Sequence, residues 1–199
     1  MILGTHNSLT YAEPTTRLGR LLNTTSQCQE LSIQEQYDYG VRYFDIRINR
    51  KSTNAKHGLV AYQVSVPQVL CLLNKLSTKE DPIYVSLSYE NSLFERKSKY
   101  EKWFKEAYSA LVSSYRNIVF TGGYAKHPWR KVIDVPAVEM NEKYWEFGNY
   151  RWEATTKDKI KKFFINLFHF SPKYWAEKNN MTYKKEYENS NLMLDFVNL

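Results

Sequence analysis

The chain carries two histidines, His6 and His57, with an Asp-x-Arg motif, Asp45 and Arg47, between them in the sequence. Histidine titrates near neutral pH, so two of them can supply a base and an acid to one reaction. Arginine carries a permanent, forked positive charge that suits phosphate. A carboxylate beside an imidazole fixes its tautomer and stabilises its charged form. Cleavage of a phosphodiester by an internal hydroxyl nucleophile needs these groups, with the positive charge against the phosphoryl oxygens.

Each of these residues also has an ordinary structural interpretation. A histidine in a loop is more often structural than catalytic, and an Asp-x-Arg pair on a strand is more often an ion pair. The segment Gly4-Thr5-His6 could be a simple turn. The occurrence of all of them in this order is what favours the catalytic interpretation.

Five short motifs resemble the catalytic domain of bacterial-type phosphatidylinositol-specific phospholipase C. Gly4-Thr5-His6-Asn7-Ser8 resembles its first signature, Gly-Thr-His-Asp/Asn-Ser. The segment 34–47 resembles the second, Gln…Gly-x-Arg-x-Phe-Asp-Ile-Arg, and His57-Gly58 resembles the third. Ser86-Leu87-x-x-Glu90 and Leu194-Asp195-Phe196-Val197 resemble the fourth and the last barrel motifs. These motifs lie in the first half of the chain and in its last ten residues.

The resemblance implies a role for each of these residues. His6 would be the general base that takes the proton of the inositol 2-hydroxyl, and Asp195 would orient it. Arg47 would neutralise the charge of the transition state, and Asp45 would support the geometry of arginine and phosphate. His57 would be the general acid for the diacylglycerol oxygen. The products would be diacylglycerol and a cyclic inositol phosphate, which makes the enzyme formally a lyase.

Two positions bear on the need for a metal. Asn7 stands where bacterial members usually have aspartate, a residue that helps the acid histidine. Eukaryotic members have asparagine there and use it as a calcium ligand. Arg47, however, occupies the place of a second calcium-binding carboxylate, and a fixed cation there opposes a metal ion. We therefore expect a reaction without metal or cofactor.

The residues expected to contact the headgroup depart further from the family pattern. Ser88 stands where bacterial enzymes have lysine, whereas Glu90 keeps a carboxylate that could bind ring hydroxyls. Residues 149–153 weakly resemble the segment that carries the tyrosine platform under the sugar. Trp152 would take that stacking role or, equally, would pack in the core. The substrate-binding candidates are Asn7, Ser88, Glu90 and Trp152.

The elements that must position these residues alternate between strands and helices. Strands are expected at residues 2–3, 41–48, 83–87, 117–121, 131–135 and 191–197. Helices are expected at residues 32–40, 66–76, 98–114 and 157–168. This alternation predicts a parallel α/β sheet, and polar residues at the carboxyl ends of strands favour a TIM-type (β/α)8 barrel. We expect one domain over residues 1–199, with a small, distorted or incomplete barrel.

Local signals mark some element boundaries. Ser32-x-x-Glu35 is a capping box that predicts a helix start, and Gly40 suits a left-handed helix end. Pro67 is acceptable in the first turn of its helix. The chain after Trp152 is short for the remaining barrel elements, and residues 163–167 could be a strand or part of a helix.

The net charge and the composition limit the classes of binding partner. The formal net charge of +7 favours an anionic partner, or simply keeps lysine-rich helices in solution. Since no RNA-binding, zinc-finger or helix-turn-helix pattern accompanies the charge, we expect no nucleic acid as a partner.

No apolar run reaches the roughly 18–20 residues of a membrane span. Peripheral contact with a membrane is expected instead, with Trp129 as one candidate, although packing of Trp129 in an ordered loop is the favoured alternative. Cys28 and Cys71 are expected to be buried free thiols, a single bridge being the alternative.

Two rival functions stay open. A metal-dependent phosphodiesterase of the glycerophosphodiester or sphingomyelinase D type would need Glu-x-Asp after the first histidine, where this chain has Asp45-x-Arg47. A catalytically lapsed barrel could bind a lipid headgroup or a protein, although the intact catalytic set argues against it. The resemblance implies a secreted or membrane-surface protein, and we expect a monomer. The N-terminus lacks signal-peptide features, so a cytoplasmic location or an export signal outside this sequence is also considered.

Overall fold

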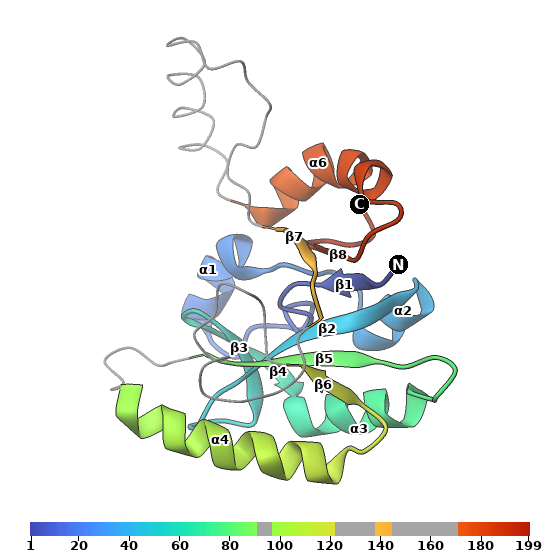
Figure 1. Cartoon of the computed structure of the whole chain (residues 1–199). Helices are drawn as coiled ribbons and strands as arrows, with labels where there is room; N and C mark the ends of the chain where they lie inside the picture. The colour runs from blue at the N-terminus through green and yellow to red at the C-terminus, as the bar shows by residue number, and fades with distance from the viewer. Residues whose placement is uncertain (91–96, 122–137, 145–170) are drawn as a thin grey trace.

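The structure is a computed structural model that describes residues 1–90, 97–121, 138–144 and 171–199. Its main feature is a six-stranded sheet with the strand order β6-β5-β2-β1-β8-β7, in which every neighbouring pair is parallel (Figure 1). The strands are β1 (Leu3–Thr5), β2 (Val41–Ile48), β5 (Tyr84–Tyr89), β6 (Val119–Thr121), β7 (Asn141–Lys143) and β8 (Leu192–Leu194). The predicted α/β class with a parallel sheet is confirmed.

Helices and one hairpin complete the described chain. The helices are α1 (Arg17–Ser26), α2 (Ile33–Asp38), α3 (Val66–Leu76), α4 (Lys97–Ser114) and α6 (Pro172–Glu186). The strands β3 (Asn54–His57) and β4 (Val60–Ser65) form a separate antiparallel pair. In Figure 1, α3 and α4 lie along one side of the sheet, and α6 lies beyond β8 at the other end.

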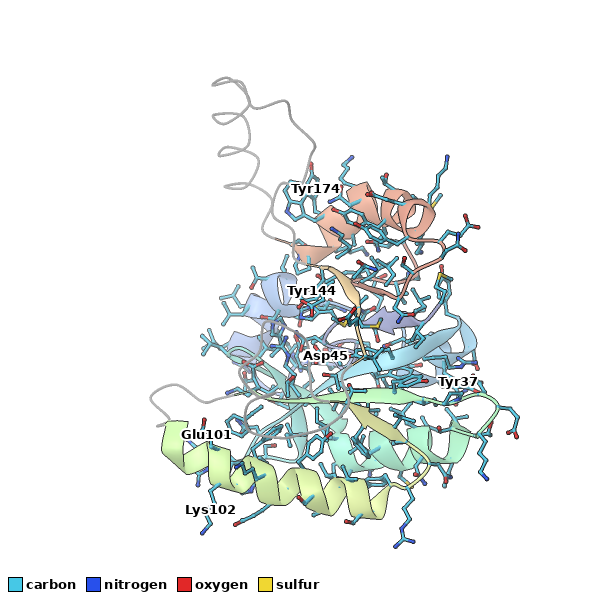
Figure 2. The ribbon with its side chains drawn as sticks, in the orientation of Figure 1. Tyr37, Asp45, Glu101, Lys102, Tyr144 and Tyr174 are labelled. Carbon is cyan, nitrogen blue, oxygen red and sulfur yellow. The ribbon has the colours of Figure 1, made fainter. Side chains whose placement is uncertain are left out.

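The strand β2 shows how the sheet divides core from site. Phe44 and Ile46 are fully buried and belong to the same apolar cluster as Leu70 and Leu73 of α3. Because successive side chains of a strand point to opposite faces, Asp45, labelled in Figure 2, lies on the face of the sheet opposite to Phe44 and Ile46. Burying each large apolar side chain contributes about 1.5–3 kcal/mol, so the helix-facing side anchors β2. The packing of Phe44 and Ile46 thereby fixes the position of β2 and of Asp45 on its opposite face.

Several predicted elements match the structure closely. β2 and α3 have the predicted bounds, and α4 begins one residue earlier than expected. Ser32 caps α2 as a capping box: its side chain accepts from the Glu35 N–H, and the Glu35 carboxylate accepts from the Ser32 N–H. Gly40 follows the helix end with φ +103°, a conformation that favours glycine.

Five elements were not predicted: α1, the two hairpin strands β3 and β4, β7 and α6. The strand β7 is the polar triplet Asn-Glu-Lys, which has no apolar alternation to detect. It nevertheless pairs with β8, so the strand beside β8 comes before Trp152, not after it. The strand predicted at 131–135, the helix at 157–168 and the ambiguous segment 163–167 lie outside the described residues.

The expectation for the cysteines was half wrong. Both are free and Cys28 is buried, but Cys71 is exposed. The buried stripe of α3 is Val66, Val69, Leu70 and Leu73, the i, i+3, i+4, i+7 pattern of a helix packed on one face. Position 71 lies off this stripe. Within the described ranges, no helix is long and apolar enough to cross a bilayer.

Candidate active site

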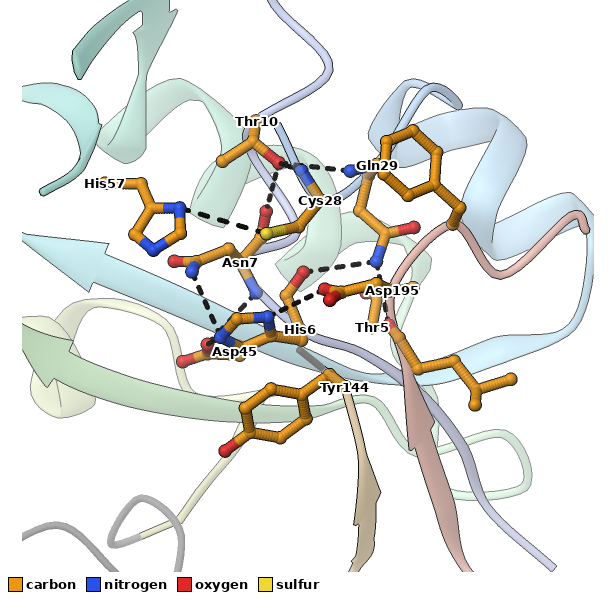
Figure 3. A network of polar contacts seen from close by, with 12 residues as sticks. Thr5, His6, Asn7, Thr10, Cys28, Gln29, Asp45, His57, Tyr144 and Asp195 are labelled. Atoms are coloured by element: carbon orange, nitrogen blue, oxygen red, sulfur yellow. Dashed lines mark hydrogen bonds and ion pairs between the residues drawn. The ribbon is translucent and has the colours of Figure 1, made fainter. Parts of the chain in front are cut away.

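Three of the predicted catalytic residues and the predicted substrate-binding Glu90 lie at the carboxyl ends of four neighbouring strands. His6 follows β1, Asp195 follows β8, Arg47 lies near the end of β2 and Glu90 follows β5. Thr5 is paired with Leu194, so the residues that come next, His6 and Asp195, lie side by side (Figure 3). The carboxyl ends of parallel strands are where barrels assemble their sites.

His6 is held in one tautomer. Its Nδ1–H donates to Asp195 Oδ1 at 2.8 Å. On the other edge, Arg47 Nη2 lies 3.0 Å from His6 Nε2 and Asn7 Nδ2 lies 3.1 Å from it. A guanidinium can only donate, so Nε2 carries the lone pair. The ring is almost fully buried, and Tyr144 stacks on it with centroids 3.8 Å apart. His6 is therefore a neutral imidazole with its basic nitrogen directed at a cation.

Arg47 is fixed by two carboxylates. Its Nη1 donates to Glu90 Oε2 at 2.7 Å, and its Nε lies 3.6 Å from Asp45 Oδ2. Its side chain is 13% exposed, so the charge is mostly shielded from water. Ser88 is paired in register with Arg47 and is fully buried. Among the described residues, Ser88 Oγ has no hydrogen-bond partner.

Asp45 ties the loop after β1 to β2. Its Oδ2 accepts from the Asn7 N–H at 3.0 Å, and its backbone carbonyl accepts from the Ser8 N–H at 2.9 Å. Asn7 has φ +44°, which asparagine tolerates better than most residues. Asp45 Oδ2 lies 4.0 Å from His6 Nε2, close enough to stabilise a positive charge on that ring.

His57 approaches the site from the hairpin. It ends β3, and Gly58 follows with φ +57° in the turn to β4. Its ring centroid lies 5.9 Å from that of His6, with the planes at 84°. The Nδ1–H donates to the Ser26 carbonyl at 2.7 Å, which leaves Nε2 for proton transfer. Burial, then the charges of Arg47 and His6, lower the pKa of His57 from 6.5 to about 4. Contrary to the expectation of a pKa near neutrality, His57 is neutral at pH 7 before an anion binds.

Several residues that support the site were not predicted. Gln29 joins β1 to β8, since its Nε2 donates to the carbonyls of His6 and Leu194, at 3.1 and 2.9 Å. Asn180 of α6 donates to the carbonyls of Asp195 and Phe196, at 2.8 and 2.9 Å. These contacts join residues up to 165 positions apart, which no local pattern encodes.

Lys56 and Tyr144 were also missed. Lys56 lines a small pocket together with Asn7, Asp45 and Arg47, which adds a second cation to the edge of the site. Tyr144 follows the short polar strand β7, and only the fold brings it onto His6. Trp152 and Trp129 lie outside the described residues, so their predicted roles stay predictions.

One group of side chains has the ligand types of a metal site. His6, Cys28 and Asp195 are all buried, and one potential ligand atom from each lies within 4.8 Å of the others. Burial, and then the Asp195 carboxylate, raise the pKa of the Cys28 thiol well above its usual value. Cys28 Sγ also lies 3.8 Å from His57 Nδ1 (Figure 3).

Several solved structures similar to this chain are bacterial phospholipases C. The chain superposes on the phosphatidylinositol-specific phospholipase C from Listeria monocytogenes with a TM-score of 0.57 and 18% identity, covering 98% of this chain and 87% of that one. A double mutant of the phosphatidylinositol-specific phospholipase C from Staphylococcus aureus gives a TM-score of 0.58 and 16% identity, covering 98% and 84%. A single histidine-to-tyrosine mutant of the S. aureus enzyme gives 0.57 and 15%, covering 98% and 84%.

The sequence itself matches no family model and no curated protein. The structural likeness confirms the expected fold: an α/β chain of the TIM-barrel type found in these phospholipases, small or incomplete in its described part. The resemblance read from the sequence motifs is thus confirmed at the level of the fold.

Proposed function

We propose that this chain, on the fold of the bacterial phosphatidylinositol-specific phospholipases C, cleaves the phosphodiester of a phosphatidylinositol-type lipid. The inositol 2-hydroxyl would attack phosphorus, and the products would be diacylglycerol and a cyclic inositol phosphate. The observation that carries the proposal is the lone pair of His6 Nε2, held 3.0 Å from the guanidinium of Arg47. This geometry supplies a base and a fixed positive charge at one point.

The first half of the reaction belongs to His6. As the 2-oxygen forms its bond to phosphorus, its proton passes to His6 Nε2. Asp195 at Nδ1 and Asp45 near Nε2 stabilise the imidazolium that results. Substrate must turn Arg47 Nη2 from the imidazole to a phosphoryl oxygen, where charge develops. Glu90 and Asp45 hold the rest of the guanidinium while it turns.

The second half belongs to His57. The bond from phosphorus to the diacylglycerol oxygen breaks, and that oxygen takes the proton from His57 Nε2. An acid must be protonated beforehand, yet the pKa of His57 in the free protein is only about 4. A bound phosphodiester places a negative charge beside the ring, and an opposite charge nearby favours the protonated form. Binding of the substrate thus favours protonation of His57, the acid of the reaction. Arg47 supplies the positive charge beside the phosphate, so calcium is not needed for that purpose.

The surface beside His57 suits contact with a membrane. On α1, Leu18 is 63% exposed and Leu21 77% exposed, and each follows an exposed arginine, Arg17 and Arg20. Leu59, at the tip of the hairpin on which α1 packs, is 58% exposed. Exposed leucines beside arginines are typical of a surface that inserts shallowly into acidic lipid. The helix ends at Ser26, whose carbonyl accepts from His57.

The test of the reaction is incubation with phosphatidylinositol vesicles in excess chelator, followed by phosphorus NMR. We expect the signal of a cyclic phosphodiester, and its loss in His6→Ala and His57→Ala proteins that keep their circular dichroism. Turnover that survives either substitution contradicts the mechanism. Binding of vesicles without any turnover would instead favour the lapsed-barrel interpretation. Turnover of another diester alone would keep the chemistry and replace the substrate.

The membrane contact has its own test. Replacing Leu18 and Leu21 together by serine should weaken binding to vesicles that contain acidic lipid by at least about tenfold, since each buried leucine contributes about 1.5–3 kcal/mol. Met181→Ser on α6 is the matched control, because Met181 is 75% exposed but lies on another helix. Cosedimentation measures the change, and equal binding by both variants would remove the role of α1.

A further inference from the structure

The sulfur of Cys28 lies within the candidate site, yet the proposed reaction does not use it. Cys28 is 0% exposed and comes two residues after α1. Its Sγ lies 3.8 Å from Nδ1 of His57 and within 4.8 Å of ligand atoms of His6 and Asp195. A thiol, two imidazoles and a carboxylate therefore come together from four separate segments of the chain.

These are the ligand types that zinc and similar soft divalent cations take. Zn²⁺ binds thiolate sulfur at about 2.3 Å, and imidazole nitrogen or carboxylate oxygen at about 2.0–2.2 Å, in tetrahedral sites. Ligand atoms in such a site lie about 3–4 Å apart. His6 Nδ1 and Asp195 Oδ1 are already 2.8 Å apart, so they need to separate slightly, while the Cys28 sulfur, within 4.8 Å of the group, needs to approach by about an ångström at most. His57 Nδ1 can supply a fourth ligand once it releases the Ser26 carbonyl.

The surrounding contacts hold these ligands in place. Cys28 N–H donates to Thr10 Oγ1 at 2.9 Å, and the Cys28 carbonyl accepts from Phe196 N–H at 2.6 Å. The Asp195 carbonyl accepts from Asn180. Supporting hydrogen bonds of this kind orient metal ligands and raise their affinity.

The charges also balance. A Cys28 thiolate and the Asp195 carboxylate together neutralise a divalent cation. Arg47 lies on the opposite edge of His6, at Nε2, and its own charge is paired with Asp45 and Glu90. His57 is half-buried and covers the sulfur, so an ion can enter from its side.

We propose that His6, Cys28 and Asp195 form a binding site for a soft divalent cation, Zn²⁺ or Cd²⁺, whose occupation switches off the base. The metal takes the lone pair of Nδ1, so the proton of His6 moves from Nδ1 to Nε2. The thiol loses its proton to solvent, and one proton is released for each ion bound. Nε2–H then faces Arg47 and has no lone pair for the 2-hydroxyl. The site is an inhibitory one, separate from any cation in the reaction.

Binding is tested without any lipid. The whole chain is titrated with Cd²⁺, and the ultraviolet charge-transfer band of a cadmium thiolate is recorded. We expect a band with a one-to-one end point, and release of one proton when calorimetry is repeated in buffers of different ionisation enthalpy. Cys71→Ser is the matched control, because Cys71 is the exposed free thiol. It should behave as wild type, whereas Cys28→Ser should lose the band.

Asp195→Asn provides a second variant that keeps the sulfur. It should weaken Cd²⁺ binding at least about tenfold, as loss of a charged ligand does. Loss of the band in Cys71→Ser, or an unchanged titration in Cys28→Ser, overturns the proposal. Cys28→Ala replaces Cys28→Ser if the serine protein does not fold.

Inhibition is the second arm, and it rests on the proposed function. Zn²⁺ should stop phosphatidylinositol cleavage by wild type and by Cys71→Ser, and Cys28→Ser should resist at least about tenfold more Zn²⁺. A Cys28-dependent cadmium band in a chain that cleaves no inositol lipid would support the metal site while removing the proposed reaction. Equal inhibition of wild type and Cys28→Ser would refute the inhibitory role.

Discussion

At the scale of single residues, the five predicted catalytic side chains converge although each is ordinary alone. His6 was predictable because Gly-Thr-His-Asn-Ser places it after a strand, and Arg47 because Asp-x-Arg ends another. Gln29 and Tyr144 were not, because their contacts with His6 exist only once distant strands are paired. The depressed pKa of His57 was also beyond the sequence, since it arises from burial and from neighbours in space.

Arg47→Lys should lower kcat/KM for phosphatidylinositol by about 100-fold or more. Lysine keeps the charge but loses the fork that reaches Glu90, His6 and the phosphate together. Arg42→Lys is the control, because Arg42 lies on the same strand but pairs with Asp81 away from the site. Steady-state kinetics with both variants checks this, and a similar loss in both would mean that Arg47 acts only through the strand.

His57 should make the fold less stable in acid. The unfolded chain takes up a proton at this residue below about pH 6.5, whereas the folded chain does so only near its pKa of about 4. The contribution of the neutral His57 ring to the free energy of unfolding is therefore fully present above pH 6.5. It is lost as the pH falls towards 4, by up to about 3 kcal/mol. Urea unfolding at about pH 7 and about pH 4 should show a smaller drop for His57→Gln than for wild type. An equal fall in the free energy of unfolding for both proteins would contradict a lowered pKa of His57.

At the scale of elements, predictability followed the strength of the apolar pattern. β2 and α3 were predicted with their bounds because their buried positions repeat with the period of a strand and of a helix. α6 was missed because its buried residues, Trp175, Ala176 and Asn180, include a polar one and leave a weak apolar stripe. Its role is to hold the turn after β8, where Phe196 has φ +44°, a conformation that aromatic residues rarely adopt.

Asn180→Ala should destabilise the protein by about 2–3 kcal/mol, because two buried carbonyls lose their donor. Activity should fall as well, since the Asp195 backbone becomes free to move. Thr182→Ala, at an exposed position of the same helix, should leave both unchanged. Chemical denaturation and turnover measure the two effects. An unfolding free energy for Asn180→Ala within about 0.5 kcal/mol of wild type would show that α6 does not hold the turn.

At the scale of the whole molecule, the first and the last strand of the described chain are neighbours inside the sheet. β1 lies between β2 and β8, and β8 lies between β1 and β7. The parallel sheet could be predicted from the alternation of elements. The pairing of β7 with β8 could not be predicted. β7 is a three-residue polar strand, and which strand it pairs with depends on which strand edge is left unpaired by the rest of the fold.

Removing residues 192–199 should therefore prevent folding, not merely activity. The deletion takes away β8 and several fully buried side chains, among them Leu192, Met193 and Leu194, and it leaves β1 and β7 without their shared partner. Circular dichroism and protease resistance should show a largely unfolded chain. A cooperative unfolding transition in the truncated chain would show that β1, β2, β5 and β6 suffice.

The pairing of Thr5 with Leu194 also sets when the chemistry can begin. Asp195, whose carboxylate orients His6, is synthesised 189 positions after His6. A ribosome-bound chain lacks the pair of His6 and Asp195 until Asp195 has emerged. A growing chain therefore cannot form the hydrogen bond between His6 and Asp195 until β8 has been made, so the presence of this bond reports that β1 and β8 have paired.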